Sequence, residues 1–143
     1  GGDRDYWVVK LDSIGGILWE KLYGGTDWDA GQSIQETSDQ GYIISGYSDS
    51  DDVDVTGNHG NWDYWILKVT YTGDIVWETS LGGSYHDFGA AVRTTDDGGF
   101  IAAGSTWSYD GDVSVNYGSN DIWVVKLNPI LDLEEINQEK KYL

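Results

Sequence analysis

The 143-residue sequence contains no cysteine, no methionine and a single proline, Pro129. Without cysteine the chain can form neither disulfides nor thiolate metal sites. Only eight Lys and Arg residues stand against 25 Asp and Glu residues, which gives a formal net charge of −17. Such a charge repels phosphate backbones and anionic lipid, so we expect neither nucleic-acid binding nor attachment to a membrane surface.

Long apolar runs and a signal-peptide pattern are also missing from the sequence. We therefore expect no membrane insertion. Because methionine is absent even at the first position, we expect the chain to be a processed or excised piece of a longer protein. The missing targeting signal then carries no information about secretion.

A repeat of 58 residues dominates the sequence. The segment Asp-Tyr-Trp-Val-Val-Lys-Leu at 5–11 returns as Asp-Tyr-Trp-Ile-Leu-Lys-Val at 63–69 and as Asp-Ile-Trp-Val-Val-Lys-Leu at 121–127. Residues 5–62 align with 63–120 without a gap, and 23 of the 58 positions are identical. A fixed period of this size indicates a repeat architecture. We divide the chain into repeat 1 (1–62), repeat 2 (63–120), the first strand of a third repeat (121–128) and a tail (129–143).

Each repeat contains four short apolar segments separated by Gly and Asp, a pattern typical of β-strands. The expected strands are 5–11, 17–23, 33–37 and 42–47 in the first repeat and 64–69, 75–81, 90–95 and 99–105 in the second. Four strands and a glycine doublet per repeat favour a β-propeller blade. We therefore predict an all-β chain of β-propeller type, with two four-stranded blades and the first strand of a third. For the tail we weigh a helix against a linker.

The unit Asp-Tyr-Trp-Val-Val-Lys-Leu-Asp, followed by a Trp, by Gly-Gly and by Thr-Ser-Asp-Gln-Gly-Tyr-Ile-Ile-Ser-Gly, resembles repeats of large secreted bacterial surface proteins. Those proteins are known best from Bacteroidetes and often end in a type IX secretion sorting domain. The unit is also similar to blades of Kelch and quinoprotein propellers. The resemblance covers residues 1–128 and implies an extracellular structural or adhesive module. No sorting domain is recognisable in the tail, and nothing indicates the cofactor-contacting residues of a quinoprotein.

The acidic loop that closes each repeat is the candidate metal site. Oxygen-bearing side chains stand at alternate positions, as at the start of a calcium loop. The ligands of this calcium hypothesis are Asp52, Asp54, Thr56 and Asn58 in the first copy and Asp110, Asp112, Ser114 and Asn116 in the second. The alternative is a loop of Asx turns, which uses the same residue types.

Three other repeated features indicate structure. Asp29-x-Gly31 and Asp87-x-Gly89 follow the glycine doublets, and we expect them to cap a turn. Glu20 and Glu78 recur, and we expect them to contact the recurring Lys10 and Lys68. We assign the repeated tryptophans to packing; these are Trp7, Trp19, Trp65, Trp77 and Trp123.

Aromatic residues that do not repeat are the candidate ligand site. Trp and Tyr rings beside Asp and Asn in loops suit stacking on sugar faces, while the alternative is that they cover the loop backbone. The candidates are Trp28, Trp62, Tyr85, Trp107, Tyr109 and Tyr117. The two histidines, His59 and His86, do not repeat, and no nucleophile elbow or phosphate loop is present. His86 beside Asp87 is a weak candidate for a general base.

These observations favour a non-catalytic structural or adhesive propeller module of a secreted or cell-surface bacterial protein, stabilised by calcium. One alternative is a carbohydrate-binding propeller. The other is a fragment of a propeller enzyme whose active site is shared with missing blades. Two blades cannot close a ring, so we expect partners in the form of further blades, from a parent chain or from copies of this chain.

Overall fold

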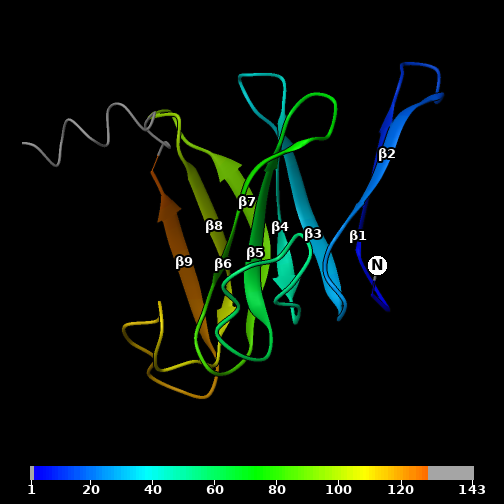
Figure 1. The fold of residues 1–143 in the computed structure, drawn as a ribbon. Coiled ribbons are helices and arrows are strands. Elements are labelled where there is room, and N and C mark those ends of the chain that lie inside the picture. Colours follow the sequence, from blue (N-terminus) through cyan, green and yellow to red (C-terminus); the bar gives the residue numbers. More distant parts are fainter. Residues whose placement is uncertain (1, 129–143) are drawn as a thin grey trace, which may run out of the picture.

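The computed structural model describes residues 2–128, and the choice between a helix and a linker for the tail falls outside this range. The described chain is all-β (Figure 1) and contains no helix that could cross a membrane. Its nine strands are β1 (Tyr6–Leu11), β2 (Ile17–Tyr23), β3 (Asp29–Glu36), β4 (Tyr42–Ser48), β5 (Asp63–Val69), β6 (Ile75–Leu81), β7 (Asp87–Thr94), β8 (Phe100–Thr106) and β9 (Asp121–Leu127).

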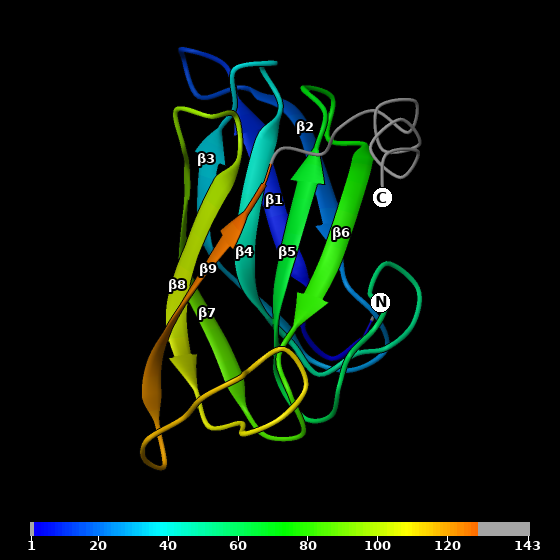
Figure 2. The same ribbon diagram turned by 90° about the vertical axis from the view of Figure 1, so that its left-hand side faces the viewer.

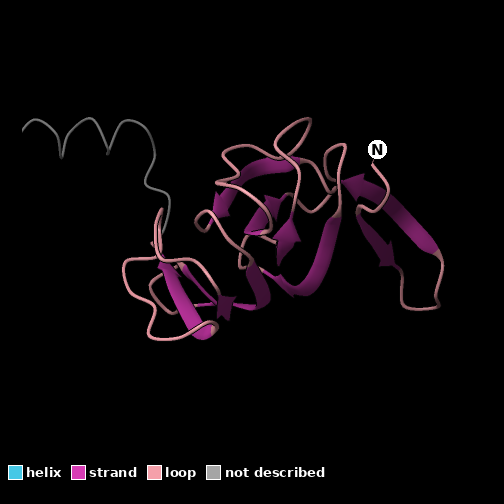
Figure 3. Ribbon diagram, turned by 90° about the horizontal axis from the view of Figure 1, so that it is seen from below, coloured by secondary structure: helices cyan, strands magenta, loops and turns pink. Residues whose placement is uncertain are grey.

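The strands form three antiparallel sheets, which lie side by side (Figures 1 and 3). Their strand orders are β1-β2, β3-β4-β5-β6 and β7-β8-β9. The expected grouping of four consecutive strands of one repeat into a blade is therefore wrong for residues 2–128. The four-stranded sheet instead joins the second half of repeat 1 to the first half of repeat 2, because β4 pairs with β5 across the repeat boundary.

Two strands begin earlier than the sequence indicates. β3 starts at Asp29 instead of residue 33, and β7 starts at Asp87 instead of residue 90. Asp and Gly are rare in strands, so these segments read as turns. Here the register of each strand shifts just after the Asp-x-Gly segment, as in a β-bulge. Gly31 and Gly89 lie within these strands and do not have positive φ, so neither glycine relieves a strained φ as expected.

The recurring lysines and glutamates do not pair with each other, contrary to expectation. Leu67 is opposite Glu78 and Lys68 is opposite Trp77, so the two charged side chains leave opposite faces of the sheet. Lys68 instead contacts Asp39 in the β3–β4 turn at 2.9 Å. Hydrogen bonds from Thr37 and Lys68 hold the pKa of Asp39 at about 2.

In the middle sheet β5 lies between β4 and β6 (Figure 2). This strand is buried along its whole length, because other sheets pack on both faces. One face packs against the β1–β2 hairpin in a cluster that contains Tyr6, Tyr23 and Trp65. The other face packs against the third sheet through Ile66, Val92 and neighbouring residues. Among the strands of the third sheet, β7 lies closest to β3, β4 and β5.

A tyrosine joins each sheet to the next one along the chain. Tyr6 donates a hydrogen bond to the carbonyl oxygen of Trp65 at 3.1 Å, and Tyr64 donates one to the carbonyl oxygen of Trp123 at 2.9 Å. In both contacts the two rings also touch, with centroids 4.6 and 4.9 Å apart. Burial raises the pKa of both phenols well above the ordinary value. We call this contact the tyrosine lock.

Replacement of Tyr64 by Phe should keep the ring contact and remove only the hydrogen bond to Trp123. We expect the free energy of unfolding to fall by about 1 kcal/mol, the usual net value of one hydrogen bond. Urea unfolding measures this difference. Tyr117→Phe is the control, because Tyr117 is 94% exposed. An equal loss in both variants would contradict the lock.

Candidate functional site

The first sheet ends in an open edge. Among residues 2–128, β1 pairs only with β2, whereas the equivalent strand β5 has β4 on one side and β6 on the other. A cleft of about 560 Å³ lies between β1 and β3. It is lined mainly by residues 4–9 and 29–34, and no residue of β2 contributes to it. The cleft therefore borders two strands that each have an unpaired edge within the described range.

The outer face of the β1–β2 hairpin is also uncovered. Trp7 is 66% exposed, although the equivalent Trp65 is fully buried beneath the hairpin. Leu11 and Leu22 are exposed beside it. The assignment of the repeated tryptophans to packing thus holds for Trp65, while Trp7 has no covering sheet among residues 2–128. The exposed face and the open edge belong to the same two strands.

Loop residues expected to bind calcium make hydrogen bonds to the glycine-doublet turns instead of converging on one point. Asp52 accepts hydrogen bonds from the N–H and hydroxyl of Thr26, at 2.8 and 2.9 Å. Asp110 does the same for Ser84. Asp54 and Asp112 accept weaker hydrogen bonds from the first glycine of each doublet.

The remaining members of the calcium set are also separated. Thr56 donates to Glu78, and Asn58 and Asn116 donate to backbone carbonyls, while Ser114 is exposed. Within residues 2–128 no group of three or more His, Asp or Glu side chains has an arrangement suited to a metal ion. Calcium binding stays a prediction. The alternative of Asx turns holds for Asn58 and Asn116, whose Oδ1 atoms accept a hydrogen bond from the N–H of the glycine two residues on.

Asp29 and Asp87, expected to cap turns, are fully buried at the starts of β3 and β7. Asp29 accepts hydrogen bonds from the N–H of Gly25 and from the hydroxyls of Ser48 and Ser50. The buried carboxylates explain why the first residue of each doublet is glycine, since they occupy the space that a side chain would need. A Cβ at residue 82 would lie 2.5 Å from Asp63 Oδ1 and 2.6 Å from Asp87 Oδ2, so no side chain fits there.

His59 and Asp63 form a pair that the sequence did not reveal. The imidazole Nδ1 lies 2.7 Å from Asp63 Oδ2, and Nε2 lies 3.7 Å from Asp112 Oδ2. Burial raises the pKa of Asp63 to about 6 despite the hydrogen bonds from His59. Burial acts to lower the pKa of His59, but the hydrogen bond and charge of Asp63, together with Asp112, raise it. In the sequence, only the separation of four residues between His59 and Asp63 hints at this pair.

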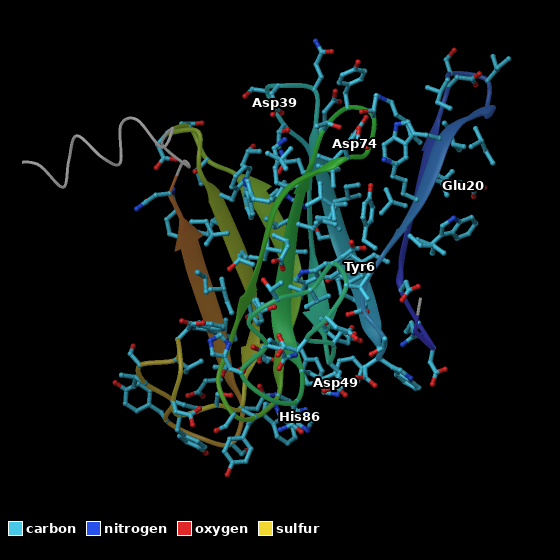
Figure 4. The ribbon with its side chains drawn as sticks, in the orientation of Figure 1. Tyr6, Glu20, Asp39, Asp49, Asp74 and His86 are labelled. Atoms are coloured by element: carbon cyan, nitrogen blue, oxygen red, sulfur yellow. The ribbon has the colours of Figure 1, made fainter. Side chains whose placement is uncertain are left out.

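Three of the predicted ligand-binding aromatics lie in one row at the loop end of the sheets. The ring centroids of Trp28 and Trp62 are 6.2 Å apart. The row continues through rings that the sequence analysis missed and ends at Trp107, in the order Trp28, Trp62, Tyr47, Phe88, His86, Trp107, with separations of 4.9 to 6.2 Å. We call these six residues the aromatic row. Figure 4 shows Asp49 and His86 at this end of the molecule.

The other predicted aromatics lie apart from the row. Tyr85 and Tyr109 contact each other edge to face, with centroids 6.2 Å apart, and Tyr117 is almost fully exposed. His86 stacks on Phe88, and its Nδ1 has no hydrogen-bond partner among residues 2–128. Asp87 bonds to Gly83 and Ser108 instead of orienting His86. The structure thus does not assemble the His86–Asp87 pair considered as a general base.

No family model and no curated protein matches this chain.

The pair of Asp63 and His59 predicts how stability depends on pH. The folded-state pKa of Asp63 is above its ordinary value of 3.8, so this group stabilises the fold fully at low pH, and its contribution is lost as the pH rises to about 6. His59 acts in the same direction at higher pH, because its folded-state pKa is also raised. We expect unfolding free energy to fall by about 2 kcal/mol between about pH 4 and pH 7.

Urea unfolding at several pH values tests this expectation. Asp63→Asn should remove most of the decline, whereas Asp5→Asn, at the equivalent position of repeat 1, should retain it. A decline that persists unchanged in Asp63→Asn would show that other groups cause it.

Proposed function

We propose that this chain is a non-catalytic structural module of a β-propeller-type assembly, completed by further strands of the same repeat. The cleft beside β1 carries the proposal. The equivalent edges of β5 and β9 are occupied by β4 and β8, so the same sequence segment has a strand neighbour in both other copies. The open edge of β1 offers the backbone N–H and C=O groups that a strand would bind.

The further strands come from a longer parent chain or from another copy of this chain. A further sheet of the same repeat would cover the outer face of the hairpin, where Trp7 lies exposed, as the hairpin covers Trp65. Removing this aromatic surface from water would favour the association. We place the assembly at the surface of a bacterial cell, where it acts as a scaffold or adhesin. The resemblance of the repeat to those of secreted surface proteins supports this location.

A hairpin peptide that copies residues 29–48 should bind to the open edge of β1. The peptide supplies a strand equivalent to β4, which pairs with β5 in the chain itself. We expect saturable binding, with NMR shift changes concentrated in the amides of β1. A peptide with Ile44→Pro is the matched control, because proline removes a backbone donor from the pairing strand.

Equal binding of the two peptides would contradict strand addition. Shift changes confined to β6 or β9 would show that the peptide recognises another edge and not the cleft.

Carbohydrate binding is the second candidate function, and the aromatic row favours it. None of the six positions is occupied by the same residue in the other repeat, so repeated packing does not explain the row. A groove of about 390 Å³ adjoins it, lined by Tyr47, Phe88, Gln32 and Ser105 together with small residues and no charged side chain. Aromatic walls with a few neutral polar groups suit a hydroxylated, uncharged ligand.

A glycan array tests this second function. Trp28→Ala and Trp107→Ala, at the two exposed ends of the row, should each weaken binding at least tenfold. Tyr117→Ala should have no effect, because Tyr117 lies outside the row. Equal binding by all variants would refute the site, and cleavage of a bound glycan would support the enzyme alternative.

A further inference from the structure

The outer face of the β1–β2 hairpin is the counterpart of two surfaces that are occupied elsewhere in the molecule. Trp65 receives the hydroxyl and the ring of Tyr6, and the equivalent Trp123 receives those of Tyr64. Trp7 is the third member of this set. Its side chain is 66% exposed, and its carbonyl oxygen accepts no tyrosine hydroxyl within residues 2–128. Trp7 is therefore an acceptor of the tyrosine lock without a donor.

A second set of contacts joins the middle sheet to the third sheet. Ser33 Oγ accepts a hydrogen bond from the N–H of Val92 at 3.3 Å, and Gln35 Oε1 accepts one from the N–H of Thr94 at 2.9 Å. These bonds satisfy backbone donors of β7, an edge strand of its sheet within the described range. We call the two side chains, Ser33 and Gln35, the edge clasp.

The third sheet has neither device at the positions where the repeat would place them. Ile122 stands at the position of Tyr64, 58 residues earlier, and is 85% exposed. An aliphatic side chain cannot donate the hydrogen bond of the lock. The equivalents of the edge clasp are Ala91 and Arg93, whose side chains contain no acceptor for a backbone N–H. The outward face of the third sheet thus cannot hold a further sheet as the middle sheet holds the third.

We propose that the outer face of the hairpin binds a sheet of the longer parent chain that carries a tyrosine at the position of Tyr6 and Tyr64. That tyrosine donates to the carbonyl oxygen of Trp7 and contacts its indole ring. A second copy of this chain is not the partner, because Ile122 occupies the tyrosine position of its third sheet. The other two tyrosines of such a copy are buried between its own sheets.

Ile122 thereby makes the chain directional, since the hairpin accepts a tyrosine-bearing sheet and the third sheet does not offer one. This inference rests on the proposed completion of the module by further strands of the repeat, and it specifies the sheet that covers Trp7.

Ile122→Tyr in the full chain tests the proposal, because it supplies the hydroxyl that the third sheet lacks. The variant should associate head to tail, with the third sheet of one copy on the hairpin of the next. Val124→Tyr is the matched control, since Val124 lies on the same face two residues on and is 53% exposed. We expect a dissociation constant about tenfold below that of the control, the effect of one hydrogen bond and one ring contact. Sedimentation velocity at several protein concentrations measures the difference.

A second readout is the ¹³C shift of the Trp7 carbonyl. This shift should move with protein concentration in Ile122→Tyr, while that of the Trp65 carbonyl stays fixed. Equal association of Ile122→Tyr and Val124→Tyr would overturn the proposal. Association of the unchanged chain that moves the Trp7 carbonyl would also overturn it, because a second copy would then be the partner.

The experiment separates this inference from the proposed function. The peptide of residues 29–48 adds a strand at the edge of β1, whereas Ile122→Tyr acts on the outer face of the hairpin. Peptide binding without association of the variant would refute only the tyrosine-bearing partner. Association of the variant without peptide binding would refute strand addition at the edge and support the hairpin face as an acceptor.

Discussion

The tyrosine lock is the contact on which the arrangement of the sheets depends. Tyr6 and Tyr64 each cross from one sheet to a tryptophan carbonyl in the next, 59 residues further along the chain. The lock needs a glycine opposite the tryptophan in the neighbouring strand, which is Gly46 for Trp65 and Gly104 for Trp123. A Cβ at Gly46 would lie 2.5 Å from the Tyr6 hydroxyl, and a Cβ at Gly104 would lie 2.7 Å from the Tyr64 hydroxyl. One tyrosine, one glycine and one tryptophan thus set the position of each sheet relative to its neighbour.

This constraint explains why the sheets do not coincide with the repeats. Strand β5, which carries Tyr64 and Trp65, lies between β4 from the second half of repeat 1 and β6 from its own half of repeat 2. A repeat boundary therefore falls in the middle of a sheet. The first sheet of the described residues contains β1 and β2, and the cleft and the exposed Trp7 adjoin these strands.

Much of the fold follows from the sequence, because its repeat and apolar segments are regular. The all-β class, nine strands and most strand bounds were predictable. The pairing of β4 with β5 was not predictable, because the 58-residue period gives the length of the repeat but not the strand at which a sheet begins. The first residues of β3 and β7 were missed because buried Asp29 and Asp87, held by serine hydroxyls and glycine N–H groups, resemble turn residues in sequence.

The candidate sites were predictable only in part. Trp28, Trp62 and Trp107 could be selected as aromatics that do not repeat, whereas Tyr47 and Phe88 lie on strands and look like core residues. The contact between His59 and Asp63 depends on the conformation of the loop that joins them, which could not be read from the residue types. Acidic residues at alternate positions indicate both a cation loop and a loop of Asx turns. Asn58 and Asn116 form such turns, whereas Asp52 and Asp110 accept hydrogen bonds from Thr26 and Ser84, 26 residues away, which the alternation does not predict.

The most direct test of the tyrosine lock is an NMR measurement of the carbonyl ¹³C shifts of Trp65 and Trp123. A carbonyl that loses a hydrogen bond should move, so Tyr6→Phe should shift Trp65 and leave Trp123 unchanged. Tyr64→Phe should do the reverse. If neither carbonyl responds, or if each substitution moves the other tryptophan, then the sheets are not joined by these contacts and the account of their order is wrong.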